Sequence, residues 1–494
     1  YNIQTFSFAN IDKYSTAGLV TRMTTDVTNV QNSYMMILRM GMRAPASMIC
    51  AMAAAFLING RIASIYLIAV VLLGCVLFFI IRKANKYFNI VFEKYDDLNA
   101  SVQENVSAIR VVKAYVREEY ETNKFANASA KVYNMFVKAE SIIACNMPVM
   151  MFTVYTCILL ISWVGAHMIV SDSLTTGNLM SLLAYCMNIL MSLMMLSMVF
   201  VMISMSMASG RRITEVINET ATIHNDDDPV MEVKDGSVVF DHVYFKYKEN
   251  AEGYVLKDIN IDIKSGETIG IIGGTGSAKT SLVNLISRLY DVTDGSVRVG
   301  GIDVRKYDME ALRNKVAVVL QKNTLFSGTI YDNLRWGNKE ATDEMCRRAC
   351  RLACADEFIE RMPDGYNTYI EQGGSNVSGG QKQRLCIARA LLKEPKILIL
   401  DDSTSAVDTA TDARIRKAFA TEIPDTTKII IAQRISSVEH ADRIIVMNEG
   451  KINGIGTHEE LLDGNDIYRE VYESQTSGGG DFDEPAVKEV KDNE

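Results

Sequence analysis

A run of apolar residues without one charged side chain is the feature that most constrains how this chain can fold. Residues 62–81 read IASIYLIAVVLLGCVLFFII. About 20 residues in a helix that rises 1.5 Å per residue cross a hydrocarbon core about 30 Å thick. We therefore predict a membrane-spanning helix over this segment. A helix buried on all sides in a soluble core is the alternative interpretation.

Three more charge-free segments, at residues 44–59, 141–166 and 178–207, indicate that the first half of the chain is a membrane domain. We place this domain at residues 1–212 and expect it to contain only α-helices. The four predicted spans lie near 42–60, 62–82, 139–170 and 177–207. The first and second spans, and the third and fourth, are joined by tight turns, whereas the connection between the second and third is long and polar.

Basic residues indicate the orientation of these spans. Arg82, Lys83 and Lys86 follow the second span, and Arg211 and Arg212 follow the fourth. Lys and Arg are enriched in short loops on the cytoplasmic side of membranes. We therefore expect a multi-pass protein of the plasma membrane, in contact with membrane lipid, whose long connection and second half lie in the cytoplasm.

Charge and cysteine content exclude two other classes of protein. The chain has 51 Lys and Arg against 60 Asp and Glu, a net charge of −9, so a nucleic-acid partner is not expected. None of its nine cysteines lies in a short outer turn, so no disulfide framework is indicated. Cys346, Cys350 and Cys354 recur every fourth residue, but no histidine or carboxylate set completes a metal site with them.

The second half contains a phosphate-binding loop. Residues 268–272 are predicted to be a buried strand, 273–280 read GGTGSAKT, and 281–290 have helical periodicity. Backbone N–H groups of such a loop bind phosphates, a lysine reaches the β and γ phosphates, and a hydroxyl ligates Mg²⁺. The sequence therefore predicts ATP and Mg²⁺ as ligands. The candidate residues are Gly273, Gly274, Thr275, Gly276, Ser277, Ala278, Lys279, Thr280 and Ser281.

Two further motifs follow downstream. The predicted strand 396–400 ends in Asp401 and Asp402, where the first carboxylate suits a Mg²⁺ shell and the second can polarise a water. Ser378, Gly379, Gly380 and Gln381 open the predicted helix 381–392. The hydroxyl and the free N–H groups at this helix N-terminus form a second site that can bind an anion. One nucleotide does not need two such sites in one domain. Two facing domains, each closing over the nucleotide of the other, would need both.

This order of motifs resembles a half-transporter of the ATP-binding cassette (ABC) exporter family, and the resemblance covers essentially the whole chain. Tyr247 is similar to the adenine-stacking aromatic of that family, and Gln321 to the glutamine of its Q-loop. Residues 378–381 resemble the signature motif, and 405–408, which end in Asp408, the D-loop. The resemblance implies that Thr280, Gln321 and Asp401 hold the metal ion.

The same resemblance predicts the architecture. We expect a type IV exporter-like membrane domain with four of its six helices, the other two preceding Tyr1, followed by an α/β P-loop NTPase domain. In the membrane half, residues 11–16 and 98–117 are similar to the two coupling regions of the family. The boundaries that we predict are a linker at 213–230, a nucleotide-binding domain at 231–473 and a disordered tail at 474–494.

Three positions depart from the family pattern. Asp402 replaces the catalytic glutamate, Gln433 replaces the switch histidine, and Ala278 replaces the glycine before the P-loop lysine. We interpret them as a degenerate nucleotide site with an intact signature, in which Asp402, Gln433 and Gln321 occupy the catalytic positions. This predicts a heterodimer with a second, competent half-transporter. Ordinary drift within an active exporter is the alternative.

The transported substrate is the least specified feature. Methionines crowd the last predicted span and could form an adaptable wall for apolar substrates, or simply pack against lipid and other helices. The three long charge-free segments, 62–81, 141–166 and 178–207, contain no Asp, Glu, Lys or Arg, which disfavours a strongly ionic pathway. We expect an amphipathic small molecule, a lipid or a peptide as substrate. A regulatory or sensing subunit without its own substrate is the rival hypothesis.

Overall fold

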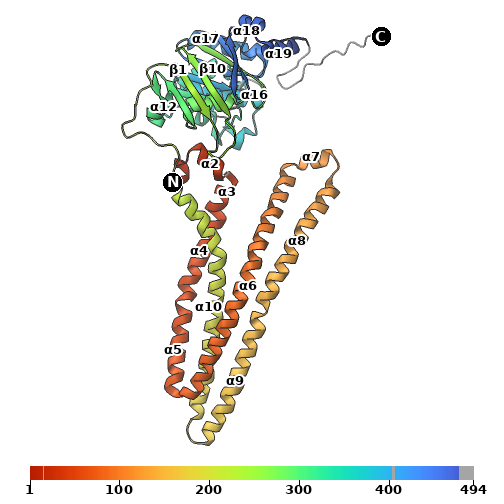
Figure 1. Ribbon diagram of the computed structural model, residues 1–494, viewed down its shortest axis with the longest axis vertical. Coiled ribbons are helices and arrows are strands. Elements are labelled where there is room, and N and C mark those ends of the chain that lie inside the picture. The colour runs from red at the N-terminus through yellow and green to blue at the C-terminus, as the bar shows by residue number, and fades with distance from the viewer. Residues whose placement is uncertain (15, 403–406, 478–494) are drawn as a thin grey trace. The chain divides into compact units, whose positions relative to one another are not determined.

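The computed structural model describes residues 1–14, 16–402 and 407–477. These residues form two compact units (Figure 1). One unit contains Asn2 and Tyr14–Glu219 and is helical. The other contains Tyr1, Ile3–Lys13 and the chain from Thr220 onward, and it holds all the β-strands of the described residues.

The helical unit is built from long helices joined by short turns. The first long helix is made of three labelled parts, α3 (Thr16–Thr21), α4 (Val27–Met36) and α5 (Arg43–Ile58). Two π-helical turns, at Arg22–Asp26 and Ile37–Gly41, link these parts. The others are α6 (Gly60–Ser107), α7 (Ile109–Ala114), α8 (Glu118–Ala144), α9 (Asn146–Val170) and α10 (Thr176–Asn218). Within the described residues, four helices are long and apolar enough to cross a membrane, which confirms the predicted number of spans.

Small residues and satisfied polar groups let the membrane helices approach closely. A Cβ on Gly165 of α9 would lie 2.4 Å from a methyl carbon of Leu179 on α10, so a larger residue here would require the Leu179 side chain to move. The buried Tyr66 of α6 donates a hydrogen bond to the carbonyl oxygen of Leu182 at 3.0 Å. Asn59 caps α6 by accepting hydrogen bonds from the backbone N–H groups of Arg61 and Ile62. The tight turn after α5 therefore starts the next helix at once.

The second unit is an α/β domain with a mixed six-stranded sheet, in the order β12-β11-β3-β10-β9-β6. Its strands are β3 (Thr268–Ile272), β6 (Val316–Val319), β9 (Ile397–Asp401), β10 (Thr427–Ile431), β11 (Arg443–Asn448) and β12 (Lys451–Gly456). All neighbours pair in parallel except β11 and β12. The carboxyl ends of β3, β9 and β10 therefore meet at one edge, and the predicted site residues follow these three strands directly.

An antiparallel sheet and flanking helices complete this unit. The sheet has the order β2-β1-β4-β5, with β1 (Val238–Phe245), β2 (Leu256–Ile263), β4 (Asp294–Val299) and β5 (Ile302–Asp303); β7 (Gly328–Thr329) pairs with β8 (Tyr369–Ile370). The helices are α11 (Lys279–Ile286), α12 (Met309–Lys315), α13 (Ile330–Arg335), α14 (Asp343–Leu352), α15 (Asp356–Ile359), α16 (Gly379–Leu391), α17 (Thr409–Glu422), α18 (His458–Gly464) and α19 (Asp466–Ser477).

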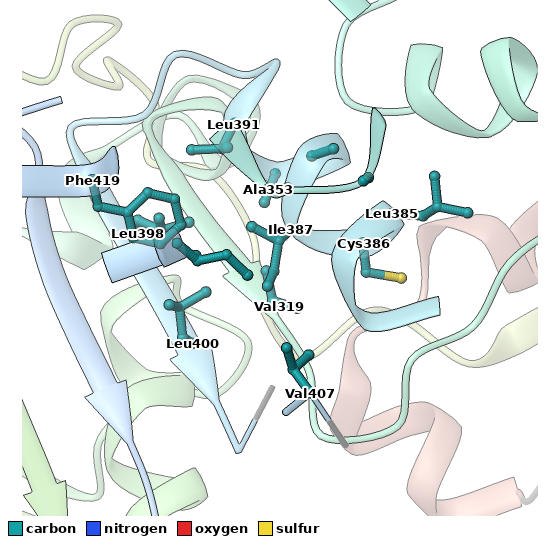
Figure 2. Packing of buried hydrophobic residues seen from close by; sticks show 14 of the residues in the cluster. Val319, Ala353, Leu385, Cys386, Ile387, Leu391, Leu398, Leu400, Val407 and Phe419 are labelled. Atoms are coloured by element: carbon teal, nitrogen blue, oxygen red, sulfur yellow. The ribbon is translucent and has the colours of Figure 1, made fainter. Parts of the chain in front are cut away.

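A buried apolar cluster fixes α16 against the sheet (Figure 2). Ile387 and Leu391 of α16 pack with Leu398 and Leu400 of β9, and Phe419 of α17 closes the cluster. The helix that carries the predicted signature motif is thus held on the strand that ends in Asp401. The cysteines at 346, 350 and 354 are buried in the same cluster.

Two segments near the ends of the chain do not follow the predicted domain boundaries. The helix α2 (Phe8–Tyr14) packs with the C-terminal unit: its buried Asn10 donates to the carbonyl oxygen of Thr220 at 3.0 Å and accepts from the backbone N–H of Thr222 at 3.2 Å. At the other end, α19 runs to Ser477, so the prediction of disorder from residue 474 is wrong for its first residues. Residues 478–494 lie outside the described residues.

Candidate functional site

The loop between β3 and α11 folds around the side chain of its lysine. The ammonium group of Lys279 donates to the carbonyl oxygens of Gly273 at 2.6 Å and Gly274 at 2.9 Å, and it lies 3.3 Å from the hydroxyl of Ser277. A Cβ on Gly273 would lie 2.3 Å from the carbonyl oxygen of Met447 on β11, so the loop backbone runs against the sheet. This is the strand, loop and helix that phosphate binding requires.

Ala278 occupies a strained position in this loop. It precedes α11 with φ 72° and ψ 24°, in the left-handed region. A residue with a Cβ pays roughly 1–2 kcal/mol for this conformation, which glycine adopts freely. The alanine is partly buried against the apolar cluster beneath the antiparallel sheet, and the loop keeps its shape around it. The substitution at this position therefore strains the loop without unfolding it.

We expect Ala278→Gly to stabilise the protein and to leave its nucleotide affinity almost unchanged. Relief of the strain should raise the free energy of unfolding by about 1 kcal/mol. This corresponds to a rise of about 2–4 °C in the midpoint temperature of thermal unfolding of the cassette. Because the left-handed turn is already formed, the dissociation constant for Mg-ATP should change by less than about twofold. Thermal unfolding and isothermal titration calorimetry measure the two quantities. A tightening of tenfold or more would mean that Ala278 distorts the loop.

Two side chains with oxygen atoms, Thr280 and Asp401, lie side by side at the start of α11 and the end of β9. The hydroxyl of Thr280 donates to Asp401 Oδ2 at 2.9 Å, and Asp401 is only 3% exposed. Burial raises the pKa of Asp401, while the Thr280 hydrogen bond and the charge of Lys279 act in the opposite direction. A hydroxyl and a carboxylate in contact are hard oxygen donors of the kind that Mg²⁺ prefers. The donor set therefore fits this ion.

The three candidate catalytic residues converge on one oxygen atom. Asp402 Oδ2 lies 3.4 Å from the amide nitrogen of Gln433 and 3.5 Å from that of Gln321. Both distances exceed the usual 2.9–3.0 Å of such bonds, so each contact is weak. The three residues follow β9, β10 and β6, which are adjacent in the sheet. Gln321 is also expected to be a metal ligand, and in the structure its amide nitrogen faces the carboxylate of Asp402.

The backbone around this group is held firmly. Asp402 has φ 48°, and its N–H donates to the carbonyl oxygen of Ile431 at 3.0 Å. Gln475 of α19 holds the turn that contains Gln433. Its amide nitrogen donates to the carbonyl oxygen of Gln433 at 3.0 Å, and its amide oxygen accepts from the N–H of Ile435 at 2.9 Å. Sequence reasoning missed Gln475, because nothing local marks a helix 42 residues downstream as the support for this turn.

Tyr247 lies beside the loop, after β1. Its hydroxyl is 2.8 Å from the hydroxyl of Ser281, and its ring packs edge-on against Phe245 and Tyr290 with centroid distances of 4.8 and 5.1 Å. The side chain remains 43% exposed. An exposed aromatic surface next to a phosphate-binding loop can stack on a planar base. Tyr290 is a second residue that sequence reasoning missed.

The predicted signature opens α16 as a capping box. Ser378 Oγ accepts from the N–H of Gln381, whose side-chain oxygen accepts from the N–H of Ser378. Ser378 and Gly379 are exposed, so the start of the helix is accessible to an anion. Asp408 caps α17 by accepting from the N–H of Thr411 at 2.9 Å. The first two D-loop residues, 405 and 406, lie outside the described residues.

Comparisons with known proteins find similar sequences for both halves of the chain. The model for the ABC transporter transmembrane region matches residues 2–194, and the ABC transporter model matches residues 256–405. The uncharacterised ABC transporter ATP-binding protein YfiB of Bacillus subtilis is 36% identical over 473 residues, which cover 96% of this chain and 82% of YfiB. YknU of the same species, described in the same terms, is 32% identical over 479 residues and is covered to 81%.

A solved structure has the same fold. It is a bacterial Atm1-family ABC exporter with ATP bound, and it superposes with a TM-score of 0.86 at 24% sequence identity. The match covers 97% of this chain and 84% of that one. The helical domain followed by an α/β cassette is therefore the fold predicted from the sequence.

Proposed function

The chain belongs to the ABC transporter family, and we propose that it is the ATP-retaining half of a heterodimeric exporter. Family membership confirms a membrane-spanning half-transporter with an ATP-binding, ATPase-type cassette on the cytoplasmic side. In the proposal, this chain binds ATP at a degenerate site. It also supplies an intact signature motif to the site where its partner hydrolyses ATP.

The observation that carries this proposal is the group of Asp402, Gln433 and Gln321. A general base must reach the proton that it removes and must be able to hold it. The carboxylate of Asp402 is one methylene shorter than a glutamate, and it is directed at two amide nitrogens. An amide such as that of Gln433 does not take up a proton at physiological pH, whereas a histidine does. These features support binding without efficient hydrolysis.

The residues that bind nucleotide are by contrast present. Lys279 and the N–H groups of the loop suit the phosphates, Tyr247 suits the adenine, and Thr280 and Asp401 suit Mg²⁺. When bound, this ion neutralises charge on the phosphates. We assign these residues to ATP binding in this chain. Ser378, Gly379 and Gly380 are assigned to the partner's nucleotide, because a helix start without an acidic first turn favours an anion.

A heterodimer follows from this combination. In a homodimer both sites would contain Asp402 and Gln433, and neither would turn over well. With a partner that carries a full catalytic set, one site can hydrolyse ATP while the other holds it. Two bound ATP molecules would then close the cassettes, and hydrolysis at one site would reopen them.

For the substrate we propose an amphipathic small molecule, with a lipid or a peptide as the alternative. The exposed face of α10 carries Met187, Met191, Met195 and Met198. Flexible thioether side chains adapt to varied apolar shapes. A regulatory subunit without a substrate of its own is the second candidate. Uptake of a labelled amphipathic substrate into inside-out vesicles that contain the pair distinguishes the two.

We expect the purified chain alone to bind Mg-ATP but to hydrolyse it about 10²-fold more slowly than the assembled pair, since general acid–base catalysis contributes a factor of that size. Calorimetry measures the binding, and phosphate release measures the turnover. Lys279→Ala is the control and should abolish binding. Rapid turnover by the chain alone that disappears in Lys279→Ala would overturn the proposal.

A further inference from the structure

A cavity of about 300 Å³ in the cassette is lined by α17, by β10 and by the segment that leads from β10 to β11. We call it the α17 cavity. Four residues of α17 line it, and they share one helix face because they recur at i, i+3, i+4 and i+7: Ala413, Arg416, Lys417 and Ala420. Both alanines are exposed, and their short side chains leave the space open.

The sheet side of the α17 cavity lies near the amino-terminal ends of two strands. Lys428 and Ile430 are next-but-one neighbours in β10, so their side chains lie on the same face of the sheet. Thr268, which also lines the cavity, is the first residue of β3 and pairs with Lys428. The loop at 273–280 follows the opposite end of β3, and none of its described residues lines the cavity. The α17 cavity is therefore separate from the nucleotide site.

Basic side chains surround the α17 cavity. None of its described lining residues is acidic, and the basic ones are Arg416, Lys417, Lys428 and His440. Acidic partners of two of them lie outside the lining. Asp412 Oδ2 is 3.3 Å from Arg416 Nη2, and Glu439 Oε1 is 3.6 Å from Nε2 of the exposed histidine. A cavity with such a lining favours an anion.

Lys428 is buried with few partners. It is only 5% exposed, and the hydrogen bond that its ammonium group donates to the carbonyl oxygen of Pro424 is 3.4 Å long, beyond the usual 2.9–3.0 Å. Within the described residues no carboxylate forms an ion pair with it. Burial lowers the pKa of Lys428, and the charges of Asp442 and Asp425 act in the opposite direction. An anion placed close to this ammonium group would offset the cost of burying it.

Arg416 has a donor without an acceptor. Its Nη1 donates to the carbonyl oxygen of Ser436 at 2.7 Å, and its Nη2 faces Asp412. Its Nε is buried and has no hydrogen-bond partner among the described residues. Buried donors in folded proteins nearly always have a partner. An orphaned donor on a residue that lines a cavity points to an acceptor that belongs in that cavity.

We propose that the α17 cavity binds a small organic carboxylate with an apolar body. The carboxylate pairs with Lys428 and Arg416. The apolar body packs on Ile430 and Phe419 (Figure 2), which line the cavity and are 7% and 2% exposed. The volume lies at the lower end of the range for pockets that hold small molecules. A carboxylate suits this site better than phosphate, because a dianion loses more solvation in a partly apolar cavity.

Binding of 2-naphthoate to the full chain in lipid nanodiscs tests the proposal. Calorimetry is run at saturating Mg-ATP, which keeps the nucleotide site occupied, and empty nanodiscs give the background from lipid. 2-Naphthamide has the same shape without the charge, so 2-naphthoate should bind about tenfold more tightly, since hydrogen bonds to charged groups are the stronger ones. Inorganic phosphate should not displace 2-naphthoate.

Two variants test the site itself. Lys428→Met keeps an unbranched apolar side chain but removes the charge, so it should weaken 2-naphthoate binding about tenfold. Ala420→Leu keeps every charge and fills the cavity, which should weaken binding by a similar factor of about ten. Lys393→Met is the matched control. The Lys393 ammonium group is also partly buried, but it donates to the carbonyl oxygen of Arg313 at 3.0 Å and does not line the cavity, so its loss should leave the affinity unchanged.

The outcomes that contradict the proposal are distinct. Absence of 2-naphthoate binding to the wild-type chain overturns it, as does equal binding of 2-naphthamide. Displacement by inorganic phosphate would show that the ligand class is wrong. Unchanged affinity in Lys428→Met or in Ala420→Leu would place the binding elsewhere, for instance among the membrane helices. Mg-ATP binding by each variant shows that its cassette is folded.

Discussion

Gly379→Asp is expected to lower the steady-state ATPase activity of the assembled pair about 10²-fold, whereas Asp402→Asn should change it less than about twofold. Gly379 is the first residue of α16, and it is exposed beside the Ser378 cap. A negative side chain there opposes the phosphate that the helix start would stabilise, and loss of one well-placed donor can cost about 3 kcal/mol. In the proposed assignment, Asp402→Asn removes a carboxylate that is too short to act as the base, so the activity should hardly change.

The comparison depends on α16 remaining folded in the variant. An acidic residue in the first turn is favourable for a helix, so Gly379→Asp should not unfold it. Gly464→Asp adds the same charge at the end of α18, where an added Cβ meets no atom within 4 Å, and it should leave the activity unchanged. Activity that survives Gly379→Asp but is lost in Asp402→Asn would reverse the assignment of the competent and degenerate sites.

The double change Asp402→Glu with Gln433→His should convert this chain's site into a working one. The longer carboxylate gains reach and the histidine can carry a proton, so turnover at this site should rise about 10²-fold. The Gln475 contacts use the backbone of Gln433 and Ile435, so the turn should keep its position when the side chain changes.

The measurement is the ATPase rate of a pair whose partner cannot hydrolyse ATP but keeps its signature. Asp402→Glu with Gln433→Asn is the matched control, because it restores the reach of the carboxylate without a group that titrates near neutral pH, and it should give a smaller gain. No gain from the glutamate–histidine pair, in a chain that binds Mg-ATP normally, would show that other residues limit the site.

Patterns that are local in sequence allowed prediction of much of this structure. The membrane helices follow from runs of apolar residues, and the loop at 273–280 follows from glycines between a strand and a helix. The sequence identified Asp402 and Gln433 only as two separate departures from the family pattern, because neither segment indicates the order of the strands in the sheet. Their contact arises because β9 and β10 are neighbours in that sheet.

Long-range packing accounts for what the sequence could not predict. The resemblance marks residues 11–16 as a coupling region, but it does not predict the contacts of Asn10 and Asp12 with residues more than 200 positions away, which group α2 with the cassette. The left-handed backbone at Ala278 is likewise a property of the folded loop. The helix α19 extends to Ser477 in a segment of low hydropathy, and Gln475 near its end bonds to the turn after β10.

Retention of ATP by this chain during turnover can be observed directly. The pair is photolabelled with 8-azido-ATP during steady-state hydrolysis, with radioactive phosphate at the γ position in one sample and at the α position in the other. We expect this chain to keep the γ label as fully as the α label, while the partner keeps only the α label. Loss of the γ label from this chain at the rate seen for the partner would contradict an ATP-retaining site.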